Sequence, residues 1–376
     1  EGAQYFVNRI TFVGNKTTHD EVIRREINLV ERGIFDTEAL QYSVRRINQL
    51  GYFEPLEEQS AIEVEKRPGY ENEVDLTLRL EESNLNQLTF GAGMSQFDGF
   101  FVQVAFQTTN FLGRGESLTL SVMNGERMKN YNIGFTEPFL FGRPITGSVD
   151  LYRRDIHWIN SFTQSSLGGS TGLGLRTGQW SQLFLSYSYE ETVVSELHPY
   201  FRNPNFLRFN PYLQDSLLLG QGGVRIISMI TPTFQFNTVD HPIFPTTGSK
   251  YIAGIELAGL GGNTSFYKPI LEGIWYLKHA ERLSFGFRAR GEYIVPYGKT
   301  AEIGAGVRGG GLPIFSLLTM GGDFSLRGFD IRSIGPSDDY TKLVIGGNKS
   351  LLFNAEYLIS IADPVRLIFF YDAGQV

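Results

Sequence analysis

An arginine in a glycine-rich segment and two later carboxylates are the residues best suited to specific chemistry. Arg327 lies in the sequence Gly-Gly-Asp-Phe-Ser-Leu-Arg-Gly-Phe-Asp, which begins at Gly321. Glu356 and Asp372 follow in two segments near the end of the sequence. The planar guanidinium carries five N–H donors, so it can pair with carboxylates in a bidentate manner. Burying such a cluster is costly, and the cost indicates a role for the loop that carries Arg327.

Sequence parity places both carboxylates on the polar face of their predicted strands. Within residues 351–361 Glu356 alternates with apolar residues, and within residues 365–373 Asp372 does the same. Side chains at i and i+2 share one face of a strand, so both carboxylates point away from the apolar face. A loop folded against the polar face would bring Arg327 to them. Three independently solvated charges fit the spacing equally well.

The sequence carries no catalytic or metal-binding signature. Its five histidines lack the His-Glu-x-x-His spacing of a zinc site, and it contains no cysteine. No Gly-x-Ser-x-Gly elbow lies on a predicted strand-to-helix turn. We therefore expect a protein that is not an enzyme, with no catalytic residues, no metal and no cofactor.

Charge is concentrated in the first part of the chain. Residues 1–82 contain 17 acidic and 10 basic residues, so they carry the whole net charge of −7 and the remainder is balanced. A nucleic-acid-binding surface needs a basic patch, which this distribution does not provide. We expect no nucleic-acid partner.

The same N-terminal part predicts a small α/β domain. Thr18 and Glu21 have the spacing of a capping box, and Asp36 and Gly51 are suited to cap the two ends of a second helix. The expected elements are a strand at 6–13, a helix at 18–27, a helix at 37–50, and strands at 62–64 and 74–80. This β-α-α-β-β order fits one independently folded domain.

From about Gln87 the apolar period changes to two. In one example, Leu283, Phe285, Phe287 and Ala289 alternate with Ser284, Gly286, Arg288 and Arg290. We count about 14 such segments, separated by turns rich in Gly, Asn, Asp and Pro. A soluble β-sandwich also alternates, but it has fewer strands and larger inward residues. The pattern favours a mainly β fold, a transmembrane antiparallel β-barrel with an apolar outer face and a polar lumen.

Together these features resemble the BamA-type family of outer-membrane assembly barrels over essentially the whole chain. Residues 1–83 are similar to a periplasmic POTRA domain, and residues 84–376 are similar to the barrel. The tripeptide Arg327-Gly328-Phe329 resembles the family signature in the long sixth extracellular loop, which folds into the barrel. A predicted periplasmic turn also looks like family sequence, with the residues Asp240, Pro242, Phe244, Pro245 and Gly248.

The resemblance implies that Arg327 pairs with Glu356 and Asp372. It also implies 16 strands whose first and last members form a weak seam, the lateral gate. The first strand would contain Leu88, Phe90, Gly91 and Gly93, whose two glycines would weaken pairing. The sequence shows one POTRA domain, whereas members of the family usually have several. It shows about 14 strands, whereas the family barrel has 16. We therefore expect the chain to be truncated at both ends.

The implied function is assembly of outer-membrane β-barrel proteins, which are folded and inserted through the seam by β-strand templating. The expected partners are unfolded outer-membrane barrel proteins as substrates, assembly-complex lipoproteins and periplasmic chaperones bound through the POTRA domain, and the lipid bilayer. The expected location is the bacterial outer membrane, with the POTRA domain in the periplasm. The alternative is a two-partner secretion pore that exports one dedicated protein through the barrel. A passive porin-like channel fits less well, since it needs no docking domain.

Overall fold

The protein forms two compact units. The computed structural model describes residues 4–56, 61–158, 161–209, 224–241, 244–302, 311–339, 342–362 and 365–376. The first unit comprises residues 1–89 with 105–120 and 134–138, and the second comprises the rest of the chain. Pro242, from the predicted turn, lies outside the described residues.

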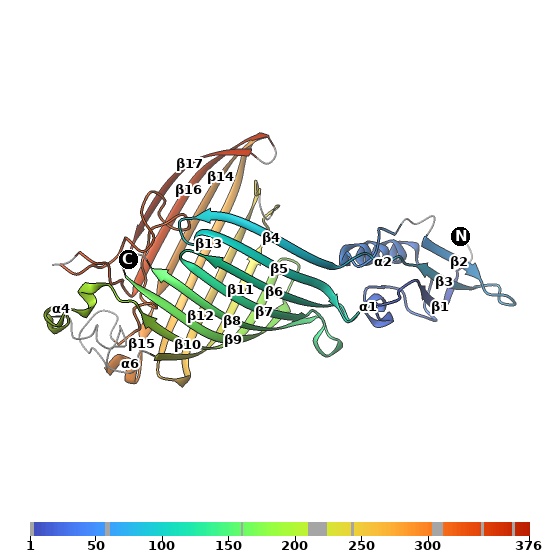
Figure 1. Ribbon diagram of the computed structural model, residues 1–376. Helices are drawn as coiled ribbons and strands as arrows, with labels where there is room; N and C mark the ends of the chain where they lie inside the picture. The colour runs from blue at the N-terminus through green and yellow to red at the C-terminus, as the bar shows by residue number, and fades with distance from the viewer. Residues whose placement is uncertain are drawn as a thin grey trace. The chain divides into compact units, whose positions relative to one another are not determined.

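The N-terminal domain is a three-stranded sheet with two helices (Figure 1). Its elements are β1 (Phe6–Val13), α1 (Asp20–Arg24), α2 (Thr37–Leu50), β2 (Ile62–Lys66) and β3 (Glu73–Arg79). Strand β3 lies in the middle, parallel to β1 and antiparallel to β2. The apolar sides of these elements meet in one core, whose fully buried members are Val7, Ile23, Ile47, Leu76 and Leu78.

The ends of the two helices test the capping predictions. The caps of α2 are confirmed, because the Asp36 side chain accepts a hydrogen bond from the Glu38 amide at 2.9 Å and Gly51 is left-handed with φ of 67°. The capping box predicted for the first helix is wrong. His19 is the N-cap residue of α1, which ends at Arg24, and the Thr18 hydroxyl instead accepts a hydrogen bond from Asn110 of the same unit.

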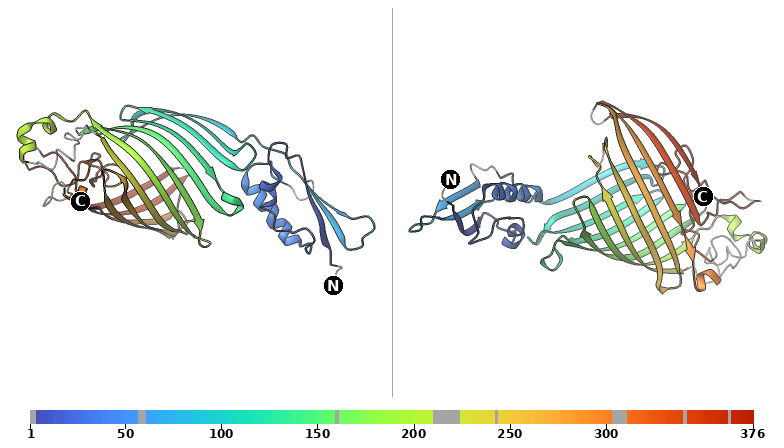
Figure 2. Two further views of the ribbon diagram at one scale, coloured as in Figure 1. Left: turned by 90° about the horizontal axis from the view of Figure 1, so that it is seen from below. Right: turned by 180° about the vertical axis from the view of Figure 1, so that it is seen from behind.

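The rest of the chain forms a 14-stranded sheet, which confirms the predicted mainly β fold. Its strands are β4 (Asn86–Ser95), β5 (Gly99–Phe111), β6 (Glu116–Gly125), β7 (Met128–Glu137), β8 (Ile145–Trp158), β9 (Phe162–Arg176), β10 (Ser181–Ser195), β11 (Val224–Asn237), β12 (Gly248–Gly262), β13 (Phe266–Ala280), β14 (Leu283–Tyr293), β15 (Val295–Pro296), β16 (Lys349–Ala362) and β17 (Val365–Gln375). Sequence neighbours lie side by side from β4 to β17, except that the short β15 pairs with β13 off this path. The pairs from β8 to β17 are antiparallel, and Figures 1 and 2 show these strands as one curved sheet.

Short helical segments occur in the connections between strands. They are η1 (Leu140–Gly142), η2 (Pro199–Arg202), α4 (Pro204–Phe209) and α6 (Lys299–Glu302). In Figures 1 and 2, α4 and α6 lie beyond the same ends of the strands. None of the helices in the described part of the chain is long and apolar enough to cross a membrane.

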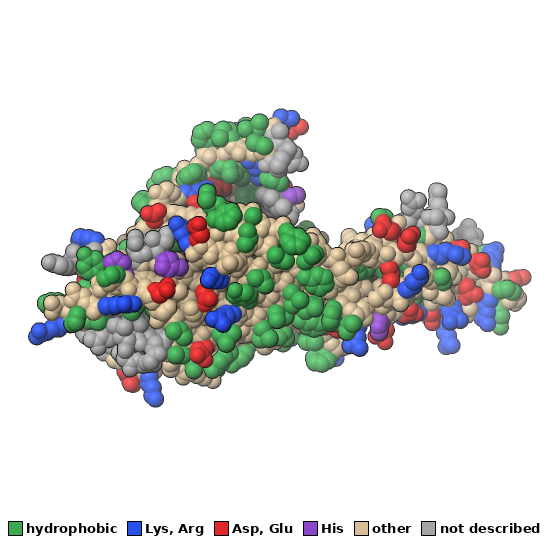
Figure 3. Space-filling view, viewed as in Figure 1, with side chains coloured by type: hydrophobic (Ala, Val, Ile, Leu, Met, Phe, Trp, Pro, Cys, Tyr) green, Lys and Arg blue, Asp and Glu red, His purple; other side chains and the backbone are tan. Residues whose placement is uncertain are grey.

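The two faces of the sheet differ in chemistry. On the outer face large apolar side chains are exposed, and both Leu271 and Leu351 keep 65% of their surface accessible. On the inner face small and polar side chains are buried, among them Thr192, Ser284 and Asn354. Figure 3 shows hydrophobic side chains gathered over the sheet, whereas charged side chains crowd the surface of the N-terminal domain. An apolar outer face and a polar inner face are those of a membrane-spanning barrel wall.

Candidate functional site

Four strands build the wall that carries the predicted carboxylates. The register across β13, β14, β16 and β17 places Ile274, Arg288, Asn354 and Asp372 in one row, and Tyr276, Gly286, Glu356 and Phe370 in the next. Directly paired residues share a face of a sheet, so these side chains line one inner surface. The strands therefore bring Glu356 and Asp372 together, as parity predicted.

The loop that faces this wall is closed on itself. Residues 320–334, which we call the Arg327 loop, are joined at their ends by two backbone hydrogen bonds between Met320 and Ile334, of 2.8 and 3.0 Å. The amide of Gly322 also donates to the carbonyl of Phe329 at 2.9 Å. At Gly321, with φ of 108°, an added Cβ would lie 2.1 Å from the Asp330 carbonyl oxygen. Glycine is therefore required where the loop turns.

Arg327 is held by both carboxylates. Its Nε donates to Oδ2 of Asp372 at 2.8 Å, and its Nη2 donates to Oδ1 of the same carboxylate at 2.6 Å. Its Nη1 donates to Oε1 of Glu356 at 2.6 Å. The Arg327 backbone amide also donates to Asp372, at 3.0 Å. This fork-to-carboxylate geometry fixes the orientation of the side chain as well as its position.

Two further residues of the wall, Asn354 and Phe370, also hold the loop. The sequence analysis did not assign them to the site. The Asn354 amide donates to the Ser325 carbonyl and to Asp372, each at 2.8 Å. The Phe370 ring lies 3.8 Å from the Arg327 guanidinium carbon, in cation–π contact. Both residues share the parity of Glu356 and Asp372, so the signal for them was present in the alternation.

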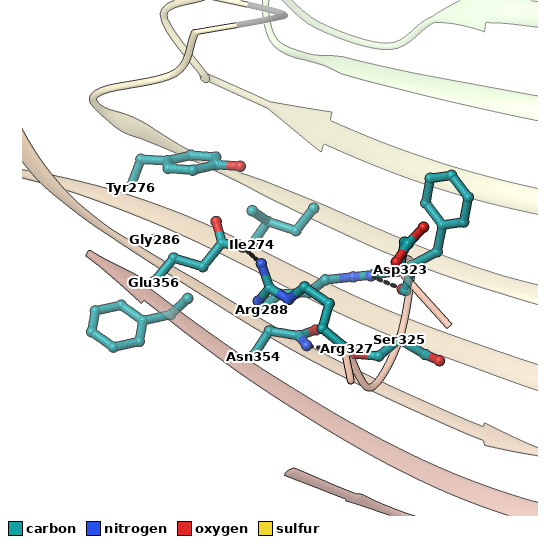
Figure 4. Close-up of a pocket in the computed structure, with 11 residues that line it drawn as sticks. Ile274, Tyr276, Gly286, Arg288, Asp323, Ser325, Arg327, Asn354 and Glu356 are labelled. Atoms are coloured by element: carbon teal, nitrogen blue, oxygen red, sulfur yellow. Dashed lines mark hydrogen bonds and ion pairs between the residues drawn. The ribbon is translucent and has the colours of Figure 1, made fainter. Parts of the chain in front are cut away.

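Arg288 forms a second attachment from the neighbouring strand. Its Nη1 donates to the Phe324 carbonyl at 3.0 Å, and its Nε donates to Glu272 at 2.6 Å. Figure 4 shows Arg288 and Arg327 converging beside Glu356 and Asn354. A cavity of about 210 Å³ remains between the loop and the wall. The loop is thus attached through arginines that belong to both the loop and the wall.

A small apolar contact supports the polar one. Met320, Leu326 and Leu352 are buried together. On the adjacent strand, an added Cβ at Gly374 would lie 2.6 Å from the Met320 sulfur, so a glycine there allows the loop to approach closely. The loop is therefore fixed by packing as well as by charge.

This arrangement is suited to holding the Arg327 loop against the wall rather than to catalysing a reaction. The Asp372 side chain is 4% exposed, so removal of Arg327 would leave a nearly buried carboxylate beside Glu356 without its cation. Within the described ranges, no group of three or more His, Asp or Glu side chains is placed to hold a metal ion. Gly328 and Phe329 follow Arg327 in the loop, and Phe329 contributes its carbonyl to the loop closure.

The residues predicted for the first strand lie in β4. Leu88 and Phe90 are 58% and 72% exposed, as expected for outward residues. Gly91 and Gly93 alternate with them, and an added Cβ at Gly93 would lie 2.9 Å from the Phe101 ring. Among the described residues β4 stands at an end of the strand order, with β5 as its neighbour.

The predicted turn between β11 and β12 is organised by Asp240. Its carboxylate accepts hydrogen bonds from the amides of Thr246 and Thr247 at 2.9 and 3.1 Å. Partial burial opposes ionisation of Asp240, but these bonds and that from the Thr246 hydroxyl outweigh it and lower the pKa of Asp240. Gly248, with φ of 103°, closes the turn where an added Cβ would meet the Thr238 carbonyl.

The other described members of the turn contact β17. The Arg366 guanidinium lies 4.8 Å from the centre of the Phe244 ring. The same guanidinium donates to the Pro245 carbonyl at 3.4 Å. The predicted turn residues thus serve two contacts, one within the turn and one with the strand that also carries Asp372.

Comparison with known proteins agrees with this architecture. The Omp85 superfamily domain matches residues 110–376, and the POTRA family, described as a surface antigen variable number repeat, matches residues 5–83. The outer membrane protein assembly factor BamA of Nitratidesulfovibrio vulgaris is 25% identical over 98% of this chain and 44% of its own length. Three bacterial BamA relatives match nearly the whole of this chain but are much longer than it. The chain spans less than half the length of each of them. These relatives are named as assembly factors, not as enzymes.

Solved structures show the same fold. BamA of Haemophilus ducreyi lacking POTRA domains 1–3 superposes with a TM-score of 0.84 at 22% identity, covering 100% of this chain and 72% of that one. CdiB of Acinetobacter baumannii superposes with a TM-score of 0.52 at 14% identity, covering 99% and 64%. With a POTRA match at residues 5–83 and an Omp85 match over most of the remaining residues, the chain belongs to the Omp85 superfamily.

Proposed function

We propose that this chain is the POTRA and barrel part of a factor that assembles β-barrel proteins in the bacterial outer membrane. In this proposal residues 1–83 form the POTRA domain in the periplasm, and residues 84–376 form the barrel wall in the bilayer. Its substrates are unfolded outer-membrane barrel proteins. Assembly-complex lipoproteins and periplasmic chaperones bind through the POTRA domain. The names of the bacterial relatives support this assignment.

The observation that carries the proposal is the position of β4. Among the strands of the described residues it stands at an end of the order, and its middle contains Gly91 and Gly93. Glycine in a strand weakens pairing because it adds no side-chain packing. A strand edge presents unpaired N–H and C=O groups in the spacing that another strand requires. We assign β4 as the gate strand on which a substrate strand forms.

Templating at β4 would solve a specific energetic problem of the substrate. Inside a bilayer each unsatisfied backbone polar group costs several kcal/mol, because no water is present to pair with it. Addition of the substrate strand to an existing edge pairs these groups before they meet lipid. In this mechanism β4 gains a substrate strand at the edge that does not face β5, while the wall of β13, β14, β16 and β17 keeps its structure.

The contacts of Arg327 and Arg288 explain how the wall of β13, β14, β16 and β17 would keep its structure while β4 receives a substrate strand. Arg327 crosses from the loop to Glu356 on β16 and Asp372 on β17, and Arg288 adds an attachment on β14. One loop therefore braces three adjacent strands. We propose that this bracing confines opening to the region of β4.

Site-specific crosslinking tests the assignment of β4. The chain contains no cysteine, so Thr89→Cys on β4 introduces a single thiol. Ser170→Cys on β9 is the matched control, because Ser170 is paired on both sides, with Asp150 and Ser188. We expect disulfides between Thr89→Cys and a cysteine in the terminal strand of several unrelated barrel substrates, and none from Ser170→Cys. Equal crosslinking at the two positions would contradict templating at β4.

A further inference from the structure

A second arginine of the Arg327 loop makes a different kind of contact. The Arg332 guanidinium carbon lies 5.0 Å from the ring centre of Trp158 and 5.6 Å from that of Phe162. Trp158 is the last residue of β8 and Phe162 is the first residue of β9. The guanidinium also donates to the Ile314 carbonyl at 3.3 Å. Within the described residues, Arg332 forms no ion pair with a carboxylate, so aromatic faces rather than anions hold its charge.

The backbone at Arg332 shows that this contact constrains the loop. Its φ is 58°, in the left-handed region that non-glycine residues rarely adopt. Such a conformation persists where the surroundings determine it. The aromatic pair and the Ile314 carbonyl are the surroundings that receive this side chain. Arg327 and Arg332 therefore attach one closed loop to two separate parts of the sheet, the β16–β17 pair and the β8–β9 hairpin.

The β8–β9 hairpin is in turn joined to the turn between β4 and β5. The Phe97 ring meets the Trp158 ring edge-on, with centres 5.6 Å apart. Next to it, Gln96 Nε2 donates to Oδ1 of Asp330 in the Arg327 loop at 3.2 Å. Arg127 holds the same turn through a hydrogen bond to the Gln96 carbonyl. The turn thus contacts the loop directly through Gln96 and indirectly through Phe97 and Trp158.

We infer that Arg332 is a positioning residue that sets the place of the β4–β5 turn by clamping the Arg327 loop onto Trp158 and Phe162. The loop is closed by the Met320 and Ile334 hydrogen bonds, so displacement at Arg332 moves Asp330 and its bond to Gln96. The contact with Trp158 transmits the same displacement to Phe97. The importance of Arg332 for substrate assembly rests on the proposed function of β4. The mechanical coupling between the Arg327 loop and the β4–β5 turn does not depend on that function.

Hydrogen exchange of the purified chain in lipid nanodiscs, without substrate, tests the coupling. Arg332→Gln removes the cation, and we expect exchange at residues 94–102 to accelerate about three- to tenfold while peptides of β12 and β13 stay unchanged. Arg332→Lys keeps a cation but not the planar fork, so its effect should be smaller. Arg176→Gln, at the other end of β9, is the control and should change nothing in this region.

Two results would overturn the inference. One is unchanged exchange at residues 94–102 in folded Arg332→Gln. The other is equal acceleration throughout the sheet, which would show a general loss of stability. Phe162→Leu removes one aromatic face from Arg332 and leaves the direct contact between Phe97 and Trp158 in place, so it decides the question if Arg332→Gln does not fold. Since no substrate is present, a negative result leaves the proposed assembly function intact, and failure of Thr89→Cys to crosslink would leave this coupling intact.

Discussion

The N-terminal domain and the sheet place the same residue types in opposite positions. In the N-terminal domain Leu76 and Leu78 are fully buried in a core. In the sheet, Leu271 and Leu351 are exposed on the outer face, while Glu272 and Asp372 are nearly buried on the inner face. The first arrangement is stable with water outside. The second is stable with lipid outside, which identifies the solvent of each region from its side chains.

The largest expected effect distinguishes the two environments of leucine. Leu76→Ala leaves a cavity in the N-terminal core and should destabilise that domain by about 2–5 kcal/mol. Leu271→Ala on the outer face should cost clearly less, because lipid chains fill the vacated space and no cavity forms. Thermal unfolding of each variant in nanodiscs, with hydrogen exchange to localise the change, measures both. Equal costs at the two positions would show that the outer face is packed against protein instead of lipid.

The next effect tests the charges on the inner face. Arg327→Ala leaves Asp372 and Glu356 without their cation and should destabilise the wall by about 2–4 kcal/mol, less than for a fully buried pair because the Arg327 side chain is 21% exposed. Exchange at β16 and β17 should accelerate, and barrel assembly in a complementation strain should fall. Arg176→Ala at an exposed strand end is the control. Unchanged thermal unfolding together with unchanged growth would remove the cluster from the account.

A smaller effect is expected at the neighbouring arginine. Arg288→Met removes the hydrogen bonds to the Phe324 carbonyl and to Glu272, but Glu272 keeps Arg290 as a cation at 3.8 Å. We expect a loss of about 1–2 kcal/mol, because each hydrogen bond contributes about 1 kcal/mol. A double-mutant cycle with Arg327→Ala separates a shared brace from two independent ones. Strict additivity would indicate that the two arginines act separately.

The smallest effect concerns pH at the turn. The pKa of Asp240 is lower in the folded protein, so its ionised form stabilises the turn above the unfolded value of about 4, and this stabilisation is lost as the pH falls through the folded value. Asp240→Asn should therefore be less stable than the parent at neutral pH and should approach it in acid. Thermal unfolding of both proteins across this range is the measurement. A constant difference at every pH would assign the effect to geometry alone.

The sequence predicted more of the wall than of the loop contacts. Alternation was sufficient for Glu356 and Asp372, because parity within a strand depends only on neighbouring residues. It also placed Arg288 on the polar face. The partner of Arg288 is a carbonyl of Phe324, and the partners of Arg332 are Trp158 and Phe162, so these contacts depend on where the loop folds.

The failed capping box shows the same limit in the N-terminal domain. The spacing of Thr18 and Glu21 was suitable, but the Thr18 hydroxyl is bound to Asn110, far along the chain. Asp36 and Gly51 succeeded because their partners are within the helix they cap. Residue spacing therefore predicts a helix cap reliably when the hydrogen-bond partners of the capping side chain lie nearby in the sequence.

The most direct test of the central claim, that this protein assembles outer-membrane barrels, is to deplete it in its host and quantify the outer-membrane proteome. We predict a fall across many unrelated barrel proteins, with accumulation of their unfolded forms in the periplasm. Restoration by the parent chain and not by Arg327→Ala would connect that fall to the braced wall. Loss of one secreted protein, with the other barrels at normal levels, would contradict the account and assign the protein to dedicated export.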